Sequence, residues 1–111
     1  MMYLYPYKID KFLKYHKREI VKLPIDYQVT SILSYMETLI VHHIMWLLDD
    51  SNIYDIDMEV NLNYDNELKI EFYCTDEELN SYKKILGSYF YMLEDDYFLN
   101  IEICNHGVSD N

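Results

Sequence analysis

Glycine, proline and cysteine are scarce in this chain of 111 residues, which contains two of each. The shortage of glycine and proline excludes a low-complexity chain and favours closely spaced helices and strands. Two cysteines, Cys74 and Cys104, are too few for a disulfide framework, and we expect both to be free thiols in a reducing cytosol. A chain of this length is expected to form one domain, residues 1–111, with 105–111 as a polar C-terminal tail.

The sequence also lacks a recognisable targeting signal or membrane span. Residues 1–6 have neither the basic start nor the long apolar run of a secretory signal. The apolar run at residues 39–48 contains two histidines and is too short to cross a bilayer. We therefore expect a soluble cytoplasmic protein that does not bind a membrane.

Basic side chains are missing from the middle of the chain, because no Lys or Arg occurs between Leu23 and Leu68. Nine Lys and Arg against twenty Asp and Glu give a net charge of −11. Residues 1–25 hold six basic and two acidic side chains, whereas residues 26–111 hold three basic and eighteen acidic ones. Such a field repels nucleic acid and attracts basic surfaces. A basic nucleic-acid-binding protein is thus the expected partner, although solubility alone would also explain the acidity.

Hydrophobic periodicity predicts an α+β fold in the order α-α-β-β-α-β, with helices packed on an antiparallel sheet. A basic amphipathic helix comes first, and a surface helix whose lysines face water is its simplest interpretation. The motif Thr75-Asp76-Glu77-Glu78 is typical of a helix capping box, and Glu94-Asp95-Asp96 is expected to end that helix. The expected helices are residues 8–20, 27–48 and 76–93, and the expected strands are residues 58–64, 68–74 and 97–103.

No motif for catalysis, metal binding or cofactor binding is present. The adjacent His42 and His43 would point roughly 100° apart on a helix, so they cannot share a metal as an i, i+4 pair could. There is no glycine-rich phosphate loop, and nothing near the acidic pair Asp49-Asp50 suggests a catalytic pocket. We expect no cofactor and no enzymatic activity. The thirteen tyrosines favour a protein-binding role, because tyrosine supplies rigid, amphipathic contact area at interfaces.

A set of short sequence matches runs through residues 23–104. It comprises Leu23-Pro24, Tyr27, Leu33-Ser34 and Ser51-Asn52-Ile53-Tyr54, followed by Leu68, Tyr73, Leu93, Tyr97 and Leu99. Twenty-six residues separate the Leu-Pro pair from the Ser-Asn-Ile-Tyr motif. In this pattern the chain resembles the small acidic uracil-DNA glycosylase inhibitors of staphylococci and related bacteria. The family has a longer, acidic segment before its Leu-Pro pair, and Glu19-Ile20 is the only counterpart here.

The resemblance implies that the protein imitates DNA. In that family, carboxylates stand for phosphates, and a hydrophobic pocket between helix and sheet receives the apolar wedge with which the enzyme opens the duplex. The candidate phosphate mimics are Glu19, Asp49, Asp50, Asp55, Asp57, Glu59, Asp76, Glu77 and Glu78. The candidate pocket residues are Met36, Ile40, Met58 and Val60. Taken singly, each apolar residue could instead belong to the core, and each acid could belong to an ordinary solvated face.

Two other functions are compatible with the same charge pattern. The protein could be an immunity or anti-defence protein that neutralises another basic enzyme, such as a nuclease toxin or a CRISPR effector. It could also be a structural or regulatory domain whose acidity serves only solubility. The last alternative predicts acids spread evenly over the folded surface.

Overall fold

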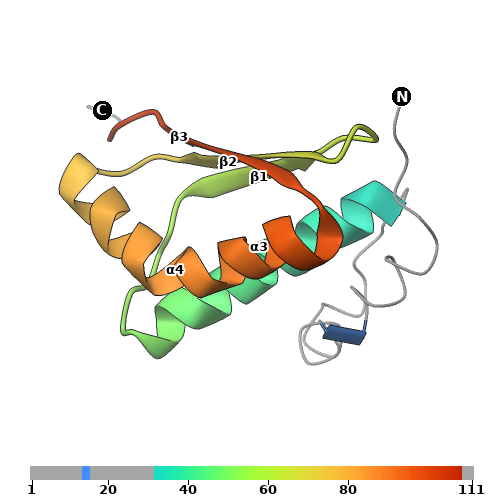
Figure 1. The fold of residues 1–111 in the computed structure, drawn as a ribbon. Helices are drawn as coiled ribbons and strands as arrows, with labels where there is room; N and C mark the ends of the chain where they lie inside the picture. The colour runs from blue at the N-terminus through green and yellow to red at the C-terminus, as the bar shows by residue number, and fades with distance from the viewer. Residues whose placement is uncertain (1–13, 16–31, 109–111) are drawn as a thin grey trace, which may run out of the picture.

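The computed structural model describes residues 14–15 and 32–108 (Figure 1). Within them, two helices lie on one face of a three-stranded sheet, which confirms the expected α+β class. The elements are α3 (Ile32–Asp50), β1 (Met58–Leu62), β2 (Glu67–Phe72), α4 (Asp76–Tyr97) and β3 (Asn100–Asn105). No helix in this part of the chain is long and apolar enough to cross a membrane.

The sheet is mixed, with the strand order β1-β2-β3. β1 and β2 form the expected antiparallel hairpin, in which Leu62 pairs with Leu68 and the turn residue Asn66 has a left-handed φ of 62°. β3, however, runs parallel to β2, so the expectation of a wholly antiparallel sheet was wrong for this strand. The reason is that α4 carries the chain back along the sheet, so the next strand starts at the same end as β2.

α3 is the central helix of the core. Its C-terminal end is a Schellman motif: Asn52 has a φ of 63°, and the N–H of Ile53 donates to the carbonyl of Leu48 at 2.9 Å. The helix therefore ends at Asp50, two residues later than expected, and residues 27–31 of the expected helix lie outside the described residues. The buried side chains of α3 recur at helical spacing at Leu33, Met36, Leu39, Ile40, His43, Ile44 and Leu48.

α4 begins with the capping box that the sequence predicted. The Thr75 hydroxyl accepts the N–H of Glu78 at 3.1 Å, and the Glu78 carboxylate accepts the N–H of Thr75 at 2.9 Å. The predicted end at Glu94-Asp95-Asp96 was wrong, because the helix continues to Tyr97, which is 2% exposed. Burial of Tyr97 thus outweighs the unfavourable acidic last turn, and the left-handed residue Phe98 (φ 54°) then ends the helix.

β3 occupies residues that the sequence assigned partly to the strand and partly to the tail. Its observed start, Asn100, is later than expected because Tyr97 belongs to α4. Its last residue, Asn105, accepts N–H groups from Cys74 at 3.3 Å and Gly107 at 3.0 Å. The N–H of His106 donates to the carbonyl of Phe72 at 2.8 Å. Asn105 and His106 were expected to belong to a polar tail. They are instead hydrogen-bonded to Cys74 and to Phe72 at the C-terminal end of β2.

The core fills the space between the sheet and the two helices. Leu68, Ile70 and Phe72 of β2 are 0–1% exposed there, and burial of each such side chain contributes roughly 1.5–3 kcal/mol. Between the two helices, the buried ring of His43 in α3 stacks on Tyr89 in α4 with centroids 4.3 Å apart. Tyr15 packs on His43 at 5.4 Å. Apart from residues 14 and 15, the expected basic helix lies outside the described residues.

Candidate partner-binding site

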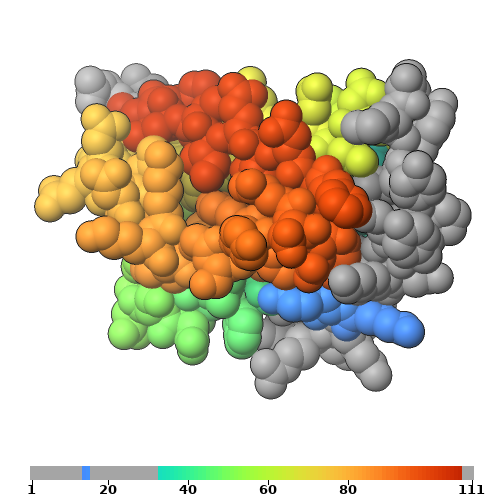
Figure 2. Space-filling view, in the orientation of Figure 1, coloured from blue at the N-terminus to red at the C-terminus, as the bar shows by residue number. Residues whose placement is uncertain are grey.

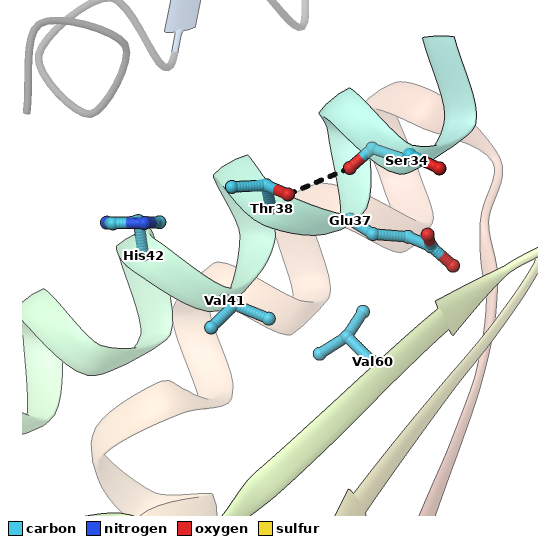
Figure 3. A pocket seen from close by; sticks show the side chains of 6 residues that line it. All are labelled: Ser34, Glu37, Thr38, Val41, His42 and Val60. Carbon is cyan, nitrogen blue, oxygen red and sulfur yellow. Dashed lines mark hydrogen bonds between the residues drawn. The ribbon is translucent and has the colours of Figure 1, made fainter. Parts of the chain in front are cut away.

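A recess of about 390 Å³ lies between α3 and β1 (Figure 3). Val41 and Val60 face each other across it, and Glu37 points toward the end of β1. On the α3 side, the Thr38 hydroxyl donates to the carbonyl of Ser34 at 2.9 Å, so this polar group is already hydrogen-bonded. The mouth of the recess is thus apolar in its centre and polar along the helix.

A second recess of about 440 Å³ continues along α3 toward its C-terminal end. It shares His42 with the first recess, and its other wall is the segment between α3 and β1. Two of its apolar side chains are well exposed, Met45 at 41% and Tyr54 at 59%. We call the two recesses together the α3 groove. It is lined by Ser34, Glu37, Thr38, Val41, His42, Met45, Trp46, Asp49, Ile53, Tyr54, Asp55, Ile56 and Val60.

The shape of the groove follows from two backbone features of the segment after α3. Asn52 and Asp55 both adopt left-handed conformations, with φ values of 63° and 57°. Asn and Asp tolerate this conformation better than most residues because their short side chains can hydrogen-bond locally. The two turns bring Ile53 and Ile56 against the core and leave Tyr54 and Asp55 exposed at the rim.

The face of the sheet opposite the helices carries a set of carboxylates. Strand alternation places Glu59, Glu67 and Glu71 on this face, since the residues of opposite parity, such as Leu62 in β1 and Leu68, Ile70 and Phe72 in β2, are buried on the other. Glu59 pairs directly with Glu71 across the hairpin. We call this surface the anionic sheet face. It comprises Asp57, Glu59, Glu67, Glu71 and Glu102, with Lys69 and His106 as its basic or titratable members.

Glu71 is the most tightly held carboxylate of the anionic sheet face. Its Oε1 lies 3.0 Å from Nε2 of His106 and 3.6 Å from Nζ of Lys69. The hydrogen bond with His106 is the main reason why the pKa of Glu71 is lowered. The ring of Tyr73 stacks on His106 at 5.1 Å. Desolvation raises the pKa of Tyr73, and the negative charges of Glu59, Glu71 and Asp57 add to the effect.

The α3 groove and the anionic sheet face meet at β1. Val60 of this strand lines the groove, whereas its neighbours Glu59 and Asn61 are exposed on the other side. An apolar recess therefore lies one strand's width from a row of carboxylates. Lys83 and Lys84 are exposed in the middle of α4, and the helix carries acidic residues near both ends.

The structure brings some of the predicted site residues together and separates others. Of the predicted phosphate mimics, Asp49 and Asp55 lie on the rim of the groove, and Asp57 and Glu59 lie on the anionic sheet face. Asp50 is exposed beside Asp49. Asp76, Glu77 and Glu78 lie at the start of α4 and not on the groove rim, and there Glu78 serves as a helix cap and Asp76 accepts a hydrogen bond from Asn105 at 3.2 Å. Glu19 lies outside the described residues.

The predicted pocket residues have different positions. Only Val60 lines the groove. Met36 and Ile40 are 1% and 0% exposed and belong to the closed core, and Met58 packs half-buried against that core. The side of α3 that faces the groove is instead the one with Glu37, Val41, His42, Met45 and Trp46, none of which was predicted as a pocket residue. The only signal for it in the sequence is that Val41, Met45 and Trp46 widen the apolar stripe of this helix.

Among the described residues, no group of three or more His, Cys, Asp or Glu side chains is placed to hold a metal ion. Burial raises the pKa of the Cys74 and Cys104 thiols, with smaller contributions from neighbouring carboxylates, so neither is activated as a thiolate.

Comparison with known proteins gives no match to this chain among family models, curated proteins or solved structures.

Proposed function

We propose that the protein is a DNA-mimicking inhibitor that occludes the nucleic-acid-binding groove of a basic enzyme, with uracil-DNA glycosylase as the target. In this role it acts by binding and not as an enzyme. Its carboxylates occupy the positions of DNA phosphates in the enzyme groove, and the α3 groove receives an apolar side chain that would otherwise enter the duplex.

The charge distribution supports this proposal. Residues 32–108 contain sixteen acidic and three basic side chains, and two of those three are Lys83 and Lys84 on the exposed side of α4. The anionic sheet face therefore has Lys69 as its only lysine within this range. A positively charged groove would be attracted to that face and would associate with it rapidly at low salt.

The observation that carries the proposal is the position of β1 between an apolar recess and a carboxylate surface. Val60 opens into the α3 groove, Glu59 is exposed on the sheet face, and Asp55 stands at the groove rim. A DNA-binding enzyme that uses both a cationic groove and an apolar wedge needs both features within one contact area.

Inhibition of uracil excision tests the proposal directly. The purified protein is titrated into a fixed amount of uracil-DNA glycosylase, and cleavage of a uracil-containing duplex is followed. We expect inhibition at near-stoichiometric ratio, with an association rate that falls as salt is added. Full activity in the presence of excess protein would exclude uracil-DNA glycosylase as the target.

Charge-reversal variants separate the proposed surface from net charge alone. Asp49→Lys combined with Asp57→Lys should slow association and reduce its salt dependence. The matched control is Glu94→Lys with Asp95→Lys, which makes the same change in net charge at the C-terminal end of α4. Equal effects of the two double variants would count against the proposed surface.

If the glycosylase is not inhibited, capture of a nuclease or CRISPR effector would favour the immunity or anti-defence alternative.

A further inference from the structure

β3 forms an edge of the sheet within the described residues, with β2 as its neighbour on one side. The N–H of Asn100 donates to Asn66 and that of His106 to Phe72, both at 2.8 Å. In a parallel ladder the backbone groups of alternate residues point to the same neighbour. The register therefore turns the N–H and C=O groups of Ile101 and Ile103 away from β2, toward the edge.

At the opposite edge of the sheet, formed by β1, a side chain covers part of the exposed backbone. At β1, the edge-facing N–H of Leu62 is bound by the carboxylate of Glu37 from α3. Natural proteins commonly protect strand edges with such covering groups, or with proline and lysine in the strand itself. The sequence of β3, NIEICN, contains neither proline nor lysine. Figure 2 shows the red surface of this strand region above α4 at the front of the molecule.

The two sides of the β3 edge have distinct chemistry. On the helix side, Ile101 and Ile103 pack half-buried against the core. On the open side, Glu102 lies opposite Lys69, and Cys104 lies opposite Glu71. A strand added here would place alternate side chains beside the apolar Ile101 and Ile103 and beside the open side, where Glu102 is the one carboxylate of β3.

We propose that the β3 edge is a docking site for an extended segment of a partner protein in which apolar and basic residues alternate. The segment adds to the sheet as a fourth strand: the backbone groups of Ile101 and Ile103 supply hydrogen bonds, and Glu102 selects basic side chains. Repulsion between two chains that each carry a net charge of −11 opposes pairing with a second copy of this chain. This surface is at the edge opposite the α3 groove and does not depend on the proposed inhibitor function.

A peptide titration followed by amide hydrogen exchange tests the docking site. The probe is an acetylated, amidated eight-residue peptide of alternating Lys and Val, and the control is the same peptide with Glu in place of Lys. We expect the Lys-Val peptide to slow exchange of the Ile101 and Ile103 amides and to leave the amides of Asn100 and Glu102, already bonded to β2, unchanged. The Glu-Val peptide should have no effect. Unchanged exchange at Ile101 and Ile103 would overturn the proposal, and so would protection that appears without peptide as the protein concentration rises, since that indicates self-pairing.

Two variants keep the test specific. Ile103→Pro removes an N–H that the ladder to β2 does not use, and peptide binding should weaken by about tenfold or more. Glu102→Lys leaves the backbone intact and should transfer the preference from the Lys-Val to the Glu-Val peptide. The matched control, Glu59→Lys, makes the same charge change on the far strand of the same face and should retain the original preference. If Ile103→Pro does not fold, the Glu102→Lys result decides, and an unaltered preference in that variant contradicts the proposal.

Discussion

The carboxylate of Glu37 accepts the backbone N–H of Leu62 at 2.6 Å, which joins the N-terminal third of α3 to the end of β1. The contact links residues 25 positions apart in the sequence and lies at the floor of the α3 groove. A charged acceptor of this kind makes a stronger hydrogen bond than a neutral one. Glu37 therefore helps to fix the width of the groove as well as closing the β1 edge.

Loss of this acceptor should destabilise the fold. In Glu37→Ala the Leu62 N–H loses its partner in a partly buried position, and we expect the free energy of unfolding to fall by about 1–3 kcal/mol. Glu37→Gln keeps a neutral acceptor, and its free energy of unfolding should lie between those of Glu37→Ala and the wild type. Urea denaturation measures all three. Equal stability of Glu37→Ala and the wild type would show that the contact contributes little.

The start of α4 should show a defined pH dependence. Hydrogen bonding to the Thr75 N–H is the main cause of the lowered pKa of Glu78. A lowered carboxyl pKa contributes stability above the unfolded-state value, near 4.5, and this contribution disappears as pH falls through the folded-state pKa. Glu78→Gln should therefore melt at a lower temperature than the wild type at pH 7, and the difference should shrink below pH 4.5. A difference that stays constant with pH would exclude this linkage.

The other half of the same capping box offers a pH-independent comparison. Thr75→Ala removes the hydroxyl that accepts the Glu78 N–H, and we expect a loss of about 1 kcal/mol. Thr75→Ser retains the hydroxyl and is the matched control. Thermal melts at pH 7 measure both, and a loss of stability as large in Thr75→Ser as in Thr75→Ala would contradict a capping role.

Tyr97 should limit stability in alkaline solution. Burial raises its pKa to about 12, with the nearby charge of Asp96 as a smaller cause. A raised pKa means that the folded state holds the proton more tightly, so stability is unaffected below the unfolded-state value, near 10, and falls between about pH 10 and pH 12. Tyr97→Phe should reduce this alkaline loss in denaturation curves. Tyr91→Phe, at a position 69% exposed, is the matched control for removal of a hydroxyl. An alkaline loss unchanged in Tyr97→Phe would contradict the assignment.

The exposed apolar residues of the α3 groove should matter for binding more than for folding. Met45→Ala with Tyr54→Ala removes two side chains that are 41% and 59% exposed. We expect inhibition of uracil-DNA glycosylase to weaken by about tenfold or more, while the free energy of unfolding changes by about 0.5 kcal/mol or less for each substitution. Tyr91→Ala, an exposed aromatic on α4, is the control and should inhibit normally. Loss of inhibition in the control alone would place the contact on α4.

Much of the fold follows from local patterns in the sequence. Period-two alternation predicted the β1–β2 hairpin, and the Thr75 and Glu78 pair predicted the start of α4. The direction of β3 could not be predicted, because alternation is the same for parallel and antiparallel strands. The end of α4 was missed since local acidic residues suggested a stop, whereas the burial of Tyr97 in the assembled core favours one further turn.

The site was less predictable than the fold. Asp49, Asp55 and Val60 became candidates through the family resemblance, and each lies at the α3 groove. Met36 and Val41 are both apolar residues of one helix, and only the packing of α4 and the sheet decides which becomes core and which faces the groove. Helical periodicity locates a stripe on α3, but it does not say which border of the stripe remains uncovered.

The mixed sheet also has a consequence for the order of folding. β2 meets β1 across a short turn, whereas its pairing with β3 requires the whole of α4 to be in place. Closing that longer loop costs more chain entropy, so the hairpin ladder should form before the parallel one. In chevron experiments, destabilising substitutions in β1 should chiefly slow refolding, whereas those in β3 should chiefly accelerate unfolding. The strand that completes the sheet is then also the first to detach from it.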